Sequence, residues 1–146
     1  MIRFRNIFPI VVFTLLVFMT VNTMGASPMD QAKTELDTAI YHGKASVDSD
    51  SAGAMKAHLH HAINCMEGPQ GQNFDSSEVN PCKGQGNGIV PDLKAAGSPA
   101  SKALKHVQEA DNIAVTSLGV SDISTLRNNI NEVVNHLEQA KAELGM

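Results

Sequence analysis

Hydrophobic residues recur at intervals of three and four positions along four stretches of the chain, and this period predicts helices. We place the four helices at about residues 29–45, 52–66, 99–118 and 122–144. No stretch alternates polar and apolar residues for long enough to predict a sheet. The expected fold class is therefore all-α.

The residues that flank these stretches indicate where each helix begins. Ser and Asp side chains are favoured N-caps, and one or more of them precedes each of the last three helices. Ser98 is expected to cap the third helix, with Pro99 at the first helical position, where no N–H is needed. Ser121 or Asp122 is expected to cap the fourth, whose apolar stripe begins at Ile123.

Short turns join the first helix to the second and the third to the fourth, which predicts two helical hairpins and an antiparallel four-helix bundle. The segment 67–97 between the hairpins is rich in Gly, Pro and Asn and shows no period, so we expect a long loop. Connections of this length are usually functional or tied down. A Cys65–Cys82 disulfide would close about 17 residues and contribute roughly 3 kcal/mol in the chain-entropy model.

The N-terminus has the layout of a secretory signal peptide. Arg3 and Arg5 precede an apolar run from about Ile7 to Val21, and small residues follow at Gly25 and Ala26. An uncleaved membrane anchor is the alternative, but the run is short for a spanning helix and is interrupted by Pro9 and two threonines. We therefore expect a cleaved segment at 1–25, a mature bundle domain at 26–146 with no stable membrane insertion, and a periplasmic or secreted location.

Cleavage would change the composition of the mature chain. Phe74 and Tyr41 remain as its only aromatic residues, so the core must be aliphatic. Removing Arg3 and Arg5 from eleven basic residues leaves nine against fifteen acidic ones, a formal net charge of −6. This balance argues against a nucleic acid partner, which requires clustered positive charge. The two cysteines favour a single disulfide in an oxidising compartment.

The histidines share one position on the four helices. His42, His58, His106 and His136 each lie directly before a residue of the apolar stripe, about 100° to the same side of it. Such positions are half-buried at the seam between neighbouring helices. Antiparallel helices with the same offset bring these residues together in pairs, so two arrangements are open: His42 with His58 and His106 with His136, or His58 with His106 and His136 with His42.

The stretch "KAHLHHAINC" adds further candidate ligands on the second helix. His61 and Cys65 lie one and two turns beyond His58 on the same flank, within reach of a common ion. Cys65 cannot act as a thiolate ligand if it is oxidised. His60 points to the other flank and is expected to be solvated.

This pattern predicts a metal site, with copper or zinc as the ion, because neutral imidazoles suit both. Hydrogen-bonded boundary histidines are the alternative reading. Carboxylates are poorly placed to help, although Glu109 and Glu132 each lie within one turn of a histidine. The candidate metal ligands are His42, His58, His61, His106 and His136.

"AIYHGKAS" and the recurrent helical pattern of Ala, His, Leu and Glu resemble the small metal-binding protein family, over about two thirds of the mature chain. The resemblance implies an exported helical protein that holds copper or other divalent metals through histidines. This chain departs from the family's pattern because it has one histidine per helix outside residues 58–61, and because it adds the disulfide loop. One or two sites are therefore expected, and not high-capacity storage.

Other functions stay open at this point. A haem bundle could use Met29, Met55 or Met66 with a histidine as axial ligands, but the chain has no C-x-x-C-H motif and few aromatic residues. No nucleophile elbow, zinc-protease motif or phosphate-binding loop predicts an enzyme. A non-enzymatic envelope protein that binds a protein partner or itself through the 67–97 loop is the main alternative to metal binding.

Overall fold

The computed structural model describes residues 25–146, in which helices are joined by loops and no strand is present. Residues 1–24, nearly all of the predicted signal peptide, lie outside the described part. The elements in chain order are α1 (Pro28–Asp48), α2 (Ala52–Glu67), α3 (Ile89–Ala96), a 3-10 turn (Ser98–Ala100), α4 (Ser101–Ser117) and α5 (Ile123–Glu143). The all-α prediction is confirmed. Across residues 25–146, no helix combines the length and apolar character needed to cross a bilayer.

Polar caps fix the beginnings of three of the long helices. The side chains of Ser27, Ser51 and Asp122 accept hydrogen bonds from backbone N–H groups inside α1, α2 and α5. The predicted cap at Ser98 is wrong. Gly97 turns the chain with a φ of +76°, and Ser98 begins a 3-10 turn whose tight geometry leads into α4 without a side-chain cap.

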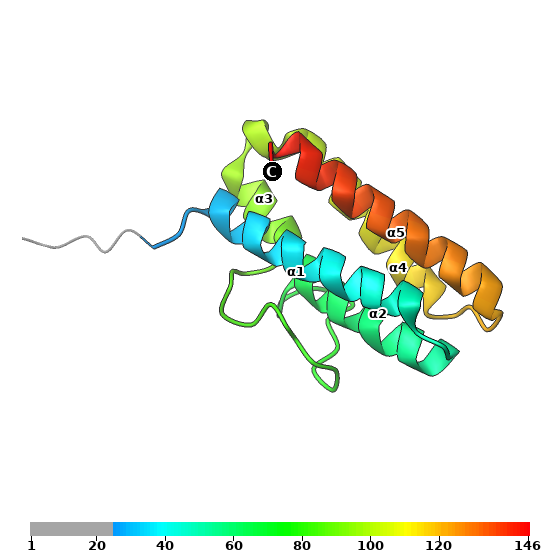
Figure 1. Ribbon diagram of the computed structural model, residues 1–146. Coiled ribbons are helices and arrows are strands. Elements are labelled where there is room, and N and C mark those ends of the chain that lie inside the picture. The colour runs from blue at the N-terminus through cyan, green and yellow to red at the C-terminus, as the bar shows by residue number, and fades with distance from the viewer. Residues whose placement is uncertain (1–24) are drawn as a thin grey trace, which may run out of the picture.

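The long helices associate as two hairpins, which meet mainly through α1 and α5. α1 packs most extensively on α2 and α4 on α5, and the elements lie side by side in Figure 1. The apolar stripes meet in one aliphatic core that contains Leu36, Leu59, Val107, Ile130 and Leu137. Ile123 was expected in this core but is 42% exposed, because α5 begins there and first packs on the core one turn later, at Leu126.

A close backbone approach and a set of hydrogen bonds help to join the hairpins near the C-terminal end of α1. A Cβ at Gly43 would come within 2.8 Å of Val134 Cγ2, so the glycine permits α1 and α5 to approach closely. Arg127 of α5 donates hydrogen bonds to the backbone oxygens of Val47 and Ser49. These oxygens lie at the end of α1, where a cation is favourable.

The connection between the hairpins is more structured than the sequence predicts. Residues 89–96 form α3, which packs against α1 and buries Ile89 and Leu93 in the core. Ile89 and Leu93 are four residues apart, but one such pair is too little to predict a helix, and Pro91 argued against one even though proline is tolerated in a first turn. The predicted Cys65–Cys82 disulfide is present, with the two Cα atoms 5.2 Å apart. The segment between α2 and α3 folds back beside α2 (Figure 1).

Candidate metal centre

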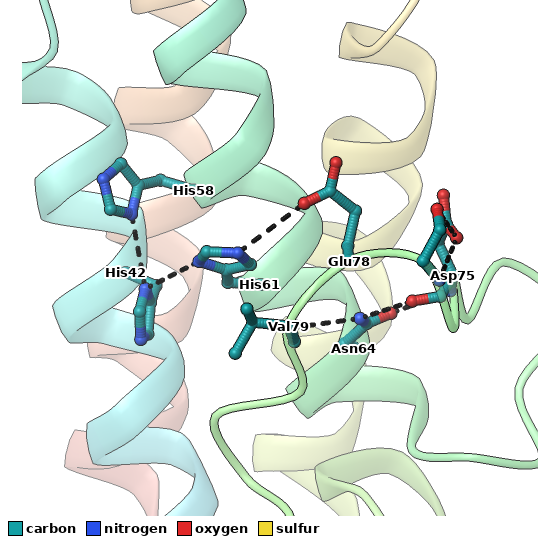
Figure 2. Close-up of polar contacts among 8 residues, drawn as sticks. His42, His58, His61, Asn64, Asp75, Glu78 and Val79 are labelled. Atoms are coloured by element: carbon teal, nitrogen blue, oxygen red, sulfur yellow. Dashed lines mark hydrogen bonds and ion pairs between the residues drawn. The ribbon is translucent and has the colours of Figure 1, made fainter.

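Three histidine rings from α1 and α2 converge on one point in the first hairpin. His42 Nδ1 lies 3.4 Å from His58 Nδ1 and 3.3 Å from His61 Nδ1, as Figure 2 shows. One ligand nitrogen from each ring falls within 4.8 Å of the other two. Within residues 25–146, these three residues are the only group of three or more candidate metal ligands at this spacing.

The packing of the hairpin explains this convergence. His58 and His61 are one turn apart on α2, so their side chains leave the same flank of the helix. Leu59 follows His58 and Ala62 follows His61, and both are buried, which fixes the rotation of α2 against the core. Near the turn, buried Ser46 of α1 donates a 2.6 Å hydrogen bond to the Met55 carbonyl oxygen, which sets the register of the two helices.

Neutral rings cannot form both of the hydrogen bonds that these distances suggest at His42 Nδ1. A neutral imidazole carries one N–H donor and one acceptor nitrogen. His42 Nδ1 has either one proton or one lone pair, so it can form a good hydrogen bond with one of its two neighbours only. A cation at the centre would accept lone pairs from all three rings.

The spacing of the nitrogens also fits metal coordination. Nitrogen ligands about 2.05 Å from a tetrahedral zinc ion are separated by about 3.3 Å. The two measured separations, 3.3 and 3.4 Å, match this value. They are longer than the roughly 2.7–3.2 Å of ordinary hydrogen bonds from N–H groups. Two of the three nitrogen separations therefore already fit one tetrahedral ion, and the third is within 4.8 Å.

Burial favours the neutral form of two rings in this cluster, those of His42 and His61. Burial, followed by the nearby His61 and His58 rings, lowers the pKa of His42 to about 4. Burial also lowers the pKa of His61, with a further lowering from His58 and an opposing effect of Glu78. Imidazole must be deprotonated to bind a metal, so both rings are ready to act as ligands at neutral pH.

A carboxylate that the sequence did not indicate approaches the outer side of the cluster. Glu78, on the segment between α2 and α3, has its Oε2 3.7 Å from His61 Nε2 (Figure 2). Glu109 and Glu132, which the sequence indicated as poorly placed to help, are both exposed. Cys65, which the sequence placed two turns beyond His58, is oxidised in the disulfide and offers no thiolate.

The other two candidate ligands form a separate pair in the second hairpin. His106 Nδ1 of α4 lies 3.5 Å from His136 Nδ1 of α5. Of the two arrangements that the sequence left open, the structure has the one that pairs histidines within each hairpin. The five candidates are thus divided into a group of three and a group of two.

His60 differs from its expected environment. The sequence indicated a solvated side chain, but the residue is half-buried, and its buried Nδ1 has no hydrogen-bond partner within residues 25–146. Asn64, one turn further along the same flank of α2, donates hydrogen bonds to the backbone oxygens of Asp75 and Val79 in the folded-back segment. The segment covers this flank of α2, and a helical period alone cannot reveal such a cover.

Two carboxyl pairs, one buried and one half-buried, lie outside the histidine cluster, and the sequence analysis found neither. Glu35 of α1 and Asp92 of α3 are 1% and 2% exposed, and Glu35 Oε1 accepts a hydrogen bond from the Gly88 N–H. Burial and the neighbouring Asp92 raise the pKa of Glu35 to about 7. Burial and Glu67 likewise raise the pKa of Asp111 to about 7.

Comparison with known proteins identifies no relative of this chain. No protein-family model, curated protein or solved structure matches the chain. The histidine cluster must therefore be interpreted from its own chemistry.

Proposed function

We propose that the protein is a non-enzymatic metal-binding protein, in which His42, His58 and His61 hold one copper or zinc ion between α1 and α2. In this proposal the long helices act as an antiparallel four-helix bundle whose seams hold the histidines. A periplasmic or secreted location, reached by means of the N-terminal signal peptide, is part of the same proposal. It agrees with the resemblance to the small metal-binding protein family.

The observation that carries the proposal is the convergence of three half-buried imidazoles with nitrogen separations of 3.3 and 3.4 Å. Burial alone would disfavour such a grouping, since each ring must lose water and find a hydrogen-bond partner. A bound ion would compensate for this cost by coordinating all three nitrogens.

The ligand types favour copper or zinc over magnesium or calcium. Imidazole suits zinc, copper and nickel, whereas magnesium and calcium prefer oxygen ligands. Three protein ligands leave a position for water or an exchanging ligand. A site of this kind supports reversible binding, as in delivery or buffering of an ion, and the paired His106 and His136 would form a second, weaker site.

Titration of the protein with zinc and copper(II) tests the proposal. We expect one tight ion per chain with micromolar or lower Kd, lost when His42, His58 and His61 are all changed to alanine. The matched control, His106→Ala with His136→Ala, should keep the tight site. Equal loss in both variants, or no binding by the unchanged protein, would contradict the proposal.

A further inference from the structure

Glu78 reaches the histidine cluster from a part of the chain that belongs to neither helix. Its Oε2 lies 3.7 Å from His61 Nε2, and the side chains of His61 and Glu78 are 15% and 35% exposed. Figure 2 shows the carboxylate on the far side of the His61 ring from His42. The two nitrogens of one ring thus have different neighbours: Nδ1 faces His42, and Nε2 faces a carboxylate.

The segment that carries Glu78 is fixed to α2 on both sides of this residue. Buried Asn64 of α2 donates hydrogen bonds to the Asp75 and Val79 carbonyl oxygens, and its own oxygen accepts one from the Asp75 N–H. The disulfide joins Cys65, the next residue of α2, to Cys82. Glu78 therefore lies between two attachments and has little freedom to leave His61.

This arrangement has a chemical consequence for His61. A carboxylate beside Nε2 favours the tautomer that carries its proton on Nε2, and this tautomer leaves the Nδ1 lone pair free. That lone pair faces the centre of the three rings. Metal-bound histidines commonly donate their other N–H to a carboxylate in this way, which fixes the ring and increases its basicity.

We propose that Glu78 is a positioning residue of the metal site, which orients His61 and selects its metal-binding tautomer, and that the disulfide-tied segment between α2 and α3 serves to deliver it. This inference rests on the proposed function. It gives a role to the segment between α2 and α3, which supplies no metal ligand itself.

Zinc affinity and the His61 tautomer, measured in the same variants, test this role. We expect Glu78→Ala to weaken zinc binding by about 10- to 100-fold, as is typical for the loss of such a partner. Glu78→Gln should recover most of the affinity, because an amide oxygen at this position is also an acceptor for the Nε2–H. The matched control Glu109→Ala removes the same charge from an exposed position and should change Kd less than about twofold.

The tautomer is read from the imidazole 15N chemical shifts of the metal-free protein. We expect the Nε2–H form at His61 in the unchanged protein and in Glu78→Gln, and a mixture in Glu78→Ala. Zinc binding and a tautomer that both survive Glu78→Ala would overturn the role of Glu78 and leave the proposed function intact. An unchanged protein that binds no zinc would overturn the proposed function and this inference with it.

Discussion

The two hairpins carry nearly the same histidine pair in different surroundings. The Nδ1 atoms are 3.4 Å apart in the pair His42 and His58 and 3.5 Å apart in the pair His106 and His136. The ring centroids are separated by 5.7 and 5.8 Å, and the ring planes are inclined by 32° and 36°. The similarity supports a common hairpin design, in which one histidine from each helix meets at the seam.

The difference between the hairpins lies one turn beyond the pair. His58 and Leu59 of α2 correspond to His136 and Leu137 of α5, so the position of His61 corresponds to Gln139. The first hairpin also has the disulfide-tied segment against its outer flank. A seam pair is thus the common element, and a third ring with a covering segment is what makes the first hairpin a candidate metal centre.

Exchanging the side chains of His61 and Gln139 should have the largest effect on zinc binding. We expect His61→Gln to weaken zinc binding at the first hairpin by at least about 100-fold, more than the loss of an outer partner. Gln139→His should give the second hairpin a three-histidine site, raising the stoichiometry from one tight ion to two. Calorimetric titration measures both changes.

The contradicting outcome of this exchange is a His61→Gln protein that binds zinc as tightly as the unchanged chain. Gln139→Ala is the control for the second hairpin and should leave the stoichiometry at one. An additional ion in that control would show that binding there does not need a third imidazole.

Removing the disulfide should test the segment that only the first hairpin possesses. Changing Cys65 and Cys82 to alanine releases a loop of 17 residues, and we expect the free energy of unfolding to fall by about 3 kcal/mol. Urea denaturation followed by circular dichroism measures this change. A loss below about 1 kcal/mol would mean that the Asn64 hydrogen bonds suffice to hold the segment.

A smaller effect is expected from the carboxyl pair that joins α1 to α3. Because the pKa of Glu35 is raised to about 7, its contribution to stability is full below about pH 4.5 and is lost as pH rises through 7. Glu35→Gln should remove this loss and stabilise the protein at pH 8 by about 2 kcal/mol relative to the unchanged chain. The comparison requires urea denaturation at pH 4.5 and pH 8. A variant that loses stability over this range as steeply as the unchanged protein would contradict the assignment.

The smallest effect concerns His42 in the absence of metal. Its pKa is lowered to about 4, so the unfolded chain takes up a proton before the folded one does. The stability due to the neutral ring is present above about pH 6.5 and is lost as pH falls toward 4. His42→Gln should reduce the slope of stability against pH in this window. An unchanged slope would mean that other groups cause the acid destabilisation.

The sequence predicts what depends on helical period and on covalent pairing. The long helices, the disulfide and the seam positions of His42, His58, His106 and His136 follow from spacing alone. The choice between the two pairings does not, because it depends on which helices become neighbours across each seam.

The features that could not be predicted from the sequence are contacts between a long helix and a segment far from it along the chain. Glu78 meets His61, and Asp92 meets Glu35, through segments without a period, so neither contact could be placed from spacing. α3 contributes only one pair of apolar core residues spaced by four, Ile89 and Leu93, which is too little to predict a helix from the sequence. The cover over His60 comes from the same returning segment.

Anomalous X-ray diffraction from crystals grown with one equivalent of zinc tests the central claim most directly. We predict a single strong zinc peak about 2.1 Å from one nitrogen of each of the His42, His58 and His61 rings. A peak between His106 and His136 alone, or no peak at any histidine, would contradict a metal centre in the first hairpin.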